Sequence, residues 1–191
     1  MFTKEKFHTY LGKVEMNSKK AQHWLVRKVI TIAEVNGLLR TVEVVAMLKS
    51  NFMKISGIWV VTFMRAKPKG PKRLSSFVIF CPKQVALLNE YFALEKIVSL
   101  RESDRIFHRL DSNQPIGKNE IAKILWQVAE YIFDHFRINP ENFTGHCWRR
   151  TGATWLANSG ASIVTLETAR GWLSSSIADV ALPKGETKNT S

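Results

Sequence analysis

The sequence predicts an α+β fold that is mostly helical and carries one small antiparallel β-sheet. Apolar residues recur with helical spacing near the beginning of the chain and again over its second half. Between these parts, two short runs of β-branched and aromatic residues flank a segment with two prolines and a glycine. With 191 residues, 45% of them apolar, the chain can bury the core of a single domain. We therefore expect one domain over residues 1–181 and a polar, disordered tail over 182–191.

Two helices and a short third one are expected before residue 50. Thr3 precedes an amphipathic stretch and suits the N-cap of the first helix. A second helix is expected over 19–35, where apolar residues follow an i, i+4, i+7, i+8 pattern. These residues are Leu25, Val29, Ile32 and Ala33. Residues 36–37, Asn-Gly, end that helix, and a short helix is expected to begin near Arg40. It would carry Glu43, Val44 and Met47.

A β-hairpin is expected next, and helices follow it. Residues 58–64 and 77–80 are rich in Val, Ile, Phe and Trp, which favours two strands. Residues 65–73 between them contain proline and glycine, so they predict a turn with a basic tip. Helical patterns then predict four helices over 83–99, 118–137, 145–158 and 162–170.

The charge of the chain is strongly positive and unevenly distributed. The formal net charge is +12, and the 46 residues from Val44 to Asn89 include no Asp or Glu. The basic residues of that segment are Lys49, Lys54, Arg65, Lys67, Lys69, Lys72, Arg73 and Lys83. A solvated basic face would account for a shorter run, but so long a segment without an acid favours contact with nucleic acid.

The cysteines and the apolar runs restrict the compartment and the cofactors. Cys81 and Cys147 fit no zinc-ligand spacing and indicate a reducing, intracellular compartment. No apolar run approaches the roughly 18 residues of a membrane span, and the N-terminus lacks a signal-peptide pattern. We expect a soluble protein that uses no metal and no small-molecule cofactor and does not bind a membrane.

Several residue types suited to phosphodiester chemistry occur in the chain. Cutting a DNA strand without a metal requires cations on the non-bridging oxygens, a proton for the leaving 5′ oxygen and a nucleophile. Arginine suits the first task because its planar fork forms two parallel hydrogen bonds to a phosphate. His146 and Arg149 are three apart near the start of an expected helix, so both project from one face, where an anion is favoured.

Four motifs in a fixed order carry a family resemblance. They are Leu38-Leu39-Arg40-Thr41-Val42-Glu43, Arg65-Ala66-Lys67, Gly145-His146-Cys147-Trp148-Arg149 and Gly171-Trp172. With them the chain resembles the catalytic domain of tyrosine recombinases, the phage integrase family, including Cre-type enzymes. The segment Gly-His-Cys-Trp-Arg-Arg also resembles the corresponding segment of eukaryotic recombinase-like proteins related to Crypton transposons. The resemblance spans about residues 2–180 and implies the fold of that catalytic core.

The resemblance also implies roles for individual residues. Arg40 and Arg149 would hold the scissile phosphate, His146 would assist proton transfer, and Lys67 would protonate the leaving oxygen. Trp172 would donate its indole N–H to a phosphate oxygen, and Glu43 would fix neighbouring basic groups. The residues expected to contact DNA around them are Arg65, Lys69, Lys72, Arg73 and Arg150.

Each of these residues also has a plainer interpretation. Arg40 could be a surface arginine at a helix start, and Glu43 a solvated helix acid. Lys67 competes with its basic neighbours on the hairpin. Trp172 could be a core tryptophan, as we expect for Trp148 and Trp155, which lie seven residues apart on one helix stripe.

The tyrosine nucleophile of the family is missing from its expected place. Ala181 occupies that position, and the tyrosines of the chain, Tyr10, Tyr91 and Tyr131, all precede His146. The sequence therefore predicts a double-stranded-DNA-binding, integrase-like domain of mobile-element origin, catalytically inactive as it stands. It would be nuclear and could self-associate on DNA. A non-enzymatic DNA-binding module is the alternative, and a basic helical scaffold for RNA or protein is a third.

Overall fold

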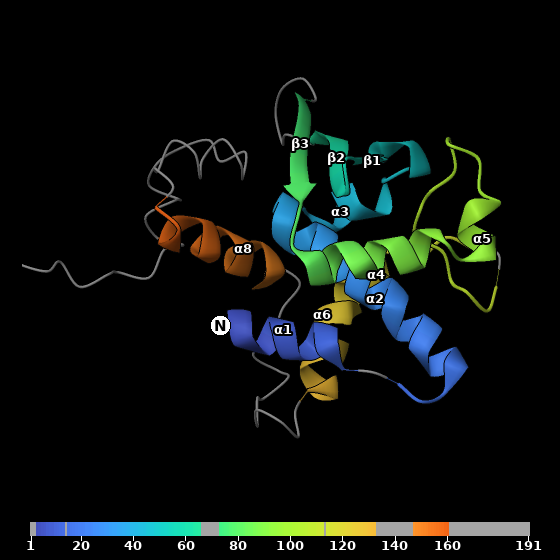
Figure 1. Cartoon of the computed structure of the whole chain (residues 1–191), viewed down its shortest axis with the longest axis horizontal. Helices are drawn as coiled ribbons and strands as arrows, with labels where there is room; N and C mark the ends of the chain where they lie inside the picture. Colours follow the sequence, from blue (N-terminus) through green and yellow to red (C-terminus); the bar gives the residue numbers. More distant parts are fainter. Residues whose placement is uncertain (1–2, 14, 66–72, 113, 133–146, 161–191) are drawn as a thin grey trace, which may run out of the picture.

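The computed structural model describes residues 3–13, 15–65, 73–112, 114–132 and 147–160. The helices within them are α1 (Lys4–Gly12), α2 (Ser18–Gly37), α3 (Thr41–Val45), the 3-10 turn η1 (Lys49–Asn51), α4 (Pro82–Phe92), α5 (Glu95–Val98), α6 (Lys118–Tyr131) and α8 (Cys147–Asn158). The strands are β1 (Phe52–Ile55), β2 (Ile58–Arg65) and β3 (Arg73–Ile79). The predicted α+β, mostly helical architecture with a small antiparallel sheet is confirmed (Figure 1).

Helix α2 is the central element of the fold. It contacts α3, α4, α6, α8 and β3. The apolar stripe predicted for it is buried, with Leu25, Val29, Ile32 and Ala33 each no more than 4% exposed. The helix continues to Gly37, two residues beyond its predicted end. The N-cap of α1 is as predicted, since the Thr3 hydroxyl accepts a hydrogen bond from the Lys6 amide at 3.3 Å. Burial of one stripe along 20 residues makes α2 the scaffold on which the other elements lie.

The sheet has the strand order β1-β2-β3, and both strand pairs are antiparallel. Strand β1 was not predicted from the sequence, because it is only four residues long and includes a lysine. A two-residue turn joins it to β2, and both turn residues, Ser56 and Gly57, have positive φ (48° and 83°), as a type I′ hairpin turn requires. Strand β3 begins at Arg73, four residues earlier than predicted, because it stays paired with β2 as far as Arg65.

Two of the predicted helices have different boundaries in the structure. The helix expected over 83–99 is two helices, because Leu94 has extended backbone angles (φ −62°, ψ 131°) and begins a new turn. The break lets Ile97 enter the core. It follows Tyr91, whose hydroxyl donates a hydrogen bond to the Ile106 carbonyl oxygen at 2.8 Å. Helix α6 ends at Tyr131 rather than at residue 137. The helix expected over 162–170 lies outside the described residues.

Helix α8 joins the core through its tryptophans. Trp148 is 2% exposed, and its ring lies 5.9 Å from that of Phe7 in α1. Trp155 is half-buried, with its ring 5.3 Å from the same phenylalanine. The prediction that both tryptophans belong to the core is confirmed, and their packing fixes the orientation of α8.

Candidate functional site

The site is built around the turn that joins α2 to α3. Leu38 adopts a left-handed conformation (φ 49°, ψ 41°), and the Leu39 amide donates to the Glu34 carbonyl oxygen at 3.1 Å. This reversal places Arg40 at the N-cap of α3. The sheet approaches the turn closely, because a Cβ on Gly37 would lie 2.5 Å from Cε1 of Phe77 in β3. The end of α2 is therefore held against the sheet immediately before Arg40.

Glu43 lies between two arginines that come from different elements. Its carboxylate accepts a hydrogen bond from the Arg40 backbone amide at 2.7 Å, and it lies 3.8 Å from Nη1 of Arg40. The same carboxylate lies 3.7 Å from Nη1 of Arg65. Its side chain is 1% exposed, so water screens these interactions weakly. Glu43 is thus a buried acid that orients a basic pair, and the interpretation as a solvated helix acid is wrong.

Arg65 points into the protein. It is 5% exposed, and its Nη2 donates to the Gly37 carbonyl oxygen at 2.9 Å, while its guanidinium lies 4.8 Å from the Phe63 ring centroid. Burial lowers the pKa of Arg65, and the charge of Glu43 partly offsets that effect. This placement does not support the expected direct contact of Arg65 with DNA. From the end of β2, Arg65 connects the sheet to the last residue of α2 and to Glu43.

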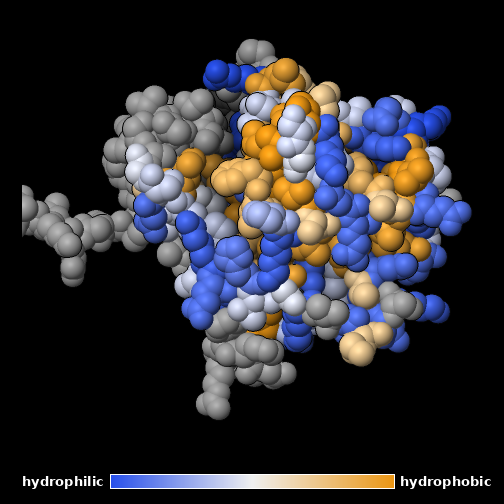
Figure 2. Space-filling view, in the orientation of Figure 1, coloured by the Kyte–Doolittle hydropathy of each residue, from blue (hydrophilic) through white to orange (hydrophobic). Residues whose placement is uncertain are grey.

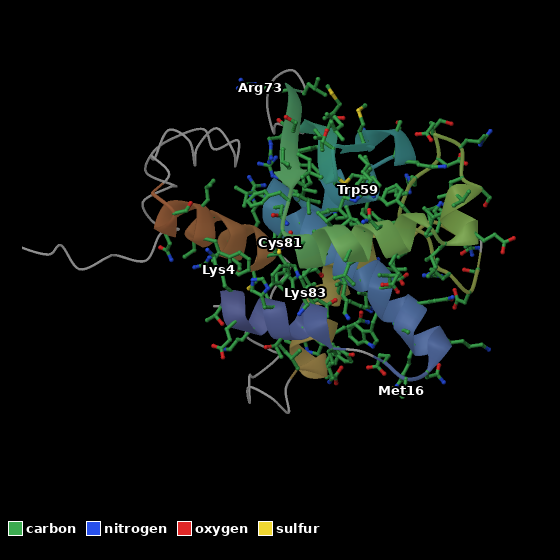
Figure 3. All side chains as sticks on the ribbon, in the orientation of Figure 1. Lys4, Met16, Trp59, Arg73, Cys81 and Lys83 are labelled. Atoms are coloured by element: carbon green, nitrogen blue, oxygen red, sulfur yellow. The ribbon has the colours of Figure 1, made fainter. Side chains whose placement is uncertain are left out.

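Arg73 stands opposite Arg65 in the β2–β3 ladder and therefore on the same face of the sheet. Unlike Arg65, it is exposed. Figure 3 shows Arg73 at the beginning of β3, and Trp59 lies beside the other end of that strand. The DNA contact predicted for Arg73 thus remains a prediction that suits its exposure.

Helix α8 carries Arg149 to the same end of α2. A Cβ on Gly152 would clash with the Val35 carbonyl oxygen and lie 2.6 Å from Cδ2 of Leu38, so α8 lies against the last turn of α2. Arg149 is one helical turn before this glycine, on the same face, and is 8% exposed. Arg40 follows Leu38 by two residues and has a side chain that is 28% exposed. The fold thus brings the ends of two motifs, more than 100 residues apart, to one end of α2.

The two glycines in this junction were not singled out as site residues from the sequence. Gly152 interrupts an otherwise regular helix, and an isolated glycine at such a position indicates close packing. Arg150, the next residue after Arg149, is exposed. The remaining predicted site residues lie outside the described part of the chain: Lys67, Lys69, Lys72, His146, Trp172 and Ala181.

A second buried carboxyl lies one turn before the end of α2. Glu34 is 4% exposed, and its Oε2 has no hydrogen-bond partner among the described residues. Burial raises the pKa of Glu34 to about 8, so its carboxyl is mostly protonated at neutral pH. It contributes a mostly neutral group to the interior, whereas Glu43 lies between two arginines.

The described residues contain no group of three His, Cys, Asp or Glu side chains that could hold a metal ion. Among the described helices, none has the length and apolar character to cross a membrane. What the described site offers chemically is cationic: a partly exposed Arg40, oriented by Glu43, and Arg149 at the same end of α2. Guanidinium groups suit an anion with several oxygens, such as a phosphodiester, which makes Arg40 and Arg149 candidates to hold one.

No protein-family model and no curated protein sequence matches the chain. Solved structures do match it. XerH site-specific recombinase bound to difH substrate has a TM-score of 0.73 and 15% identity, over 95% of this chain and 49% of that chain. XerA recombinase matches with a TM-score of 0.70 and 15% identity, over 96% of this chain and 60% of that chain. Tn1549 transposon integrase in complex with transposon right end DNA matches with a TM-score of 0.67 and 13% identity, over 94% of this chain and 60% of that chain.

This chain spans about half to three-fifths of the length of those proteins. At 13–15% identity the likeness establishes the fold. It agrees with the fold that the sequence resemblance implies and with the helical architecture around a three-stranded antiparallel sheet. The chain has the fold of the tyrosine-recombinase catalytic domain.

Proposed function

We propose that residues 1–181 form a DNA-binding, integrase-like catalytic domain of mobile-element origin, and that it is inactive as it stands because Ala181 replaces the nucleophilic tyrosine. The observation that carries the proposal is the junction at the end of α2. There Arg40 and Arg149, which belong to two of the recombinase-like motifs, lie on the recombinase fold beside a buried acid that orients Arg40. Arginine is suited to a phosphate because its planar guanidinium can form two parallel hydrogen bonds to it.

Double-stranded DNA is the proposed partner. The net charge of +12 and the acid-free segment from Val44 to Asn89 supply a sequence-independent attraction to phosphates. The solved XerH structure contains difH substrate, and the Tn1549 integrase structure contains transposon right end DNA. The transposon integrase also supports the proposed mobile-element origin. Nuclear localisation and self-association on DNA complete the proposal.

The proposed chemistry stops at binding. Arg40 and Arg149 would hold the non-bridging oxygens of one phosphate, His146 and Trp172 would donate hydrogen bonds to it, and Lys67 would lie near the bridging 5′ oxygen. Arg73 and Arg150 would contact the flanking backbone, together with Lys69 and Lys72. Cleavage needs a hydroxyl that attacks phosphorus while the P–O5′ bond breaks and a proton reaches O5′. The methyl side chain of Ala181 cannot form that bond.

The test is to restore the nucleophile with Ala181→Tyr. The variant would be incubated with a pool of nicked duplexes of random sequence, in which loss of the short strand traps the covalent product. We expect a protein–DNA adduct that survives denaturing electrophoresis. Ala181→Phe is the matched control, because it adds the same ring without the hydroxyl and should give no adduct.

The outcomes separate two candidate functions. An adduct with Ala181→Tyr alone supports a recombinase site that lacks only its nucleophile. DNA binding without an adduct favours a non-enzymatic DNA-binding module, the second candidate, which the alanine at position 181 itself favours. Failure of the unaltered chain to bind DNA in a salt-dependent manner would contradict both.

A further inference from the structure

The sheet turns one face toward the helices and the other toward solvent. Along β2 the side chains alternate, and Trp59, Val61 and Phe63 are buried. The opposite face, which we call the outer sheet face, follows from the ladder register. Its members are Met53, Ile55, Ile58, Val60, Thr62, Met64, Leu74, Ser76 and Val78.

The outer sheet face is mostly apolar, with Thr62 and Ser76 as its two polar residues, and it is uncharged and open to solvent. Leu74 is 68% exposed, Met53 is 59% exposed and Met64 is 51% exposed. Phe80, one residue beyond β3, is 74% exposed. Figure 2 shows apolar residues gathered over the strands. A contiguous apolar patch of a few hundred Å² is often functional, so this face is a candidate docking site.

We propose that a second copy of this chain docks on the outer sheet face, sheet against sheet. Two such faces can pack about 10 Å apart with their strands nearly aligned, as in a β-sandwich. The contact is isologous and uses up the face on both copies, so association stops at a dimer. The nine side chains carry no charge, so this face offers no cation to the phosphates of a nucleic acid or the carboxylates of an acidic protein.

The dimensions of the face agree with a weak dimer. At about 3.4 Å per residue and about 4.8 Å between strands, the face covers roughly 300 Å² in projection. Projecting side chains increase the accessible area, so two copies would bury roughly 1,000 Å² in total, near the lower limit of specific interfaces. We therefore expect a dissociation constant on the order of 10–100 µM, which area alone sets only loosely.

Charge gives this dimer a distinctive salt dependence. Each copy carries a net charge of +12, so two copies repel one another at low ionic strength. Added salt screens that repulsion and leaves the apolar contact intact, so dimerisation should strengthen with salt. DNA binding weakens with salt because phosphate contacts release counterions. The two properties can therefore be separated, and the proposed dimer does not depend on the proposed function.

Sedimentation equilibrium of the full chain without DNA tests the proposal, over a range of concentrations at low and high salt. The apparent mass of the wild type should rise with concentration from that of one chain toward that of two, and the rise should be larger at high salt. Val78→Glu should weaken the dimer at least about tenfold, because it buries a carboxylate in the contact. Val98→Glu is the matched control, since Val98 is a 60% exposed valine on α5 and the charge change is identical.

Met53→Glu repeats the test on another strand, and circular dichroism of each variant establishes that it is folded. Both glutamate substitutions lower the net positive charge, so a general electrostatic association would be strengthened rather than lost. A wild type that stays monomeric at high salt and high concentration would overturn the proposal. So would an equal dissociation constant for the folded Val78→Glu and Val98→Glu variants, or growth beyond two copies.

Discussion

Two buried carboxyl groups, nine residues apart, experience opposite environments at the end of α2. Glu43 faces Arg40 and Arg65 across 3.8 and 3.7 Å and accepts the Arg40 amide. Glu34 lies in the interior, its Oε2 without a hydrogen-bond partner among the described residues, and burial raises its pKa to about 8. The first lies between two arginines and orients them, and the second is a carboxyl that becomes costly when ionised. Burial alone therefore does not reveal what a buried acid does.

Glu43→Gln should have the largest effect. Glutamine keeps the shape and can still accept the Arg40 amide, but it removes the negative charge that faces the buried guanidinium of Arg65. Removing one partner of a buried pair leaves the other charge uncompensated, so we expect a loss of about 2–4 kcal/mol in the free energy of unfolding. Urea denaturation would measure the loss.

The double variant Glu43→Gln with Arg65→Met is the control for this explanation. Methionine removes the buried charge of Arg65, so the double variant should be more stable than the Glu43→Gln variant. If Glu43→Gln unfolds at the same urea concentration as the wild type, the ion-pair account of Glu43 is wrong.

Glu34→Gln should have the opposite sign and a smaller effect that depends on pH. Because the folded chain holds the Glu34 proton more tightly than the unfolded chain, this carboxyl's contribution is complete below pH 4.5, its ordinary pKa, and is lost as pH rises through about 8. Glutamine cannot ionise. The variant should therefore gain about 2 kcal/mol relative to wild type between about pH 5 and about pH 6.5.

Urea denaturation of both proteins at the two pH values would measure this gain. A difference between Glu34→Gln and wild type that is the same at both pH values would mean that Glu34 is not the group responsible. Together with Glu43→Gln, the experiment tells a paired buried acid from an unpaired one by the sign of the change.

Local patterns predicted those parts of the fold that depend on local spacing. The buried stripe of α2 and the β2–β3 hairpin follow from periods of 3.6 and 2 residues. The break at Leu94 could not be predicted, because no glycine or proline marks it in the sequence. The inward orientation of Arg65 was available in principle, since it continues the alternation of Trp59, Val61 and Phe63 along β2.

The candidate site was predictable only as far as its motif residues. Arg40, Glu43 and Arg149 were chosen by resemblance, and no local rule states that α8 lies against the last turn of α2. That contact depends on the missing side chain of Gly152, and a single glycine within a helix signals close packing without naming the partner. Long-range contacts of this kind belong to the folded chain rather than to any short segment.

The most direct test of the account is a double-mutant cycle on Arg40 and Arg149. Lysine at either position keeps the charge but loses the two-pronged hydrogen bonding of arginine. Fluorescence anisotropy with a labelled short DNA duplex at fixed salt would give the affinity of the wild type, Arg40→Lys, Arg149→Lys and the double variant. Arg150→Lys is the control, because Arg150 is an exposed neighbour of Arg149.

If Arg40 and Arg149 hold one phosphate, the effects of their substitution on affinity should be coupled by about 1 kcal/mol or more. The effects of Arg40→Lys and Arg150→Lys on affinity should be additive. Additive effects of Arg40→Lys and Arg149→Lys, with both variants folded, would contradict a shared phosphate site.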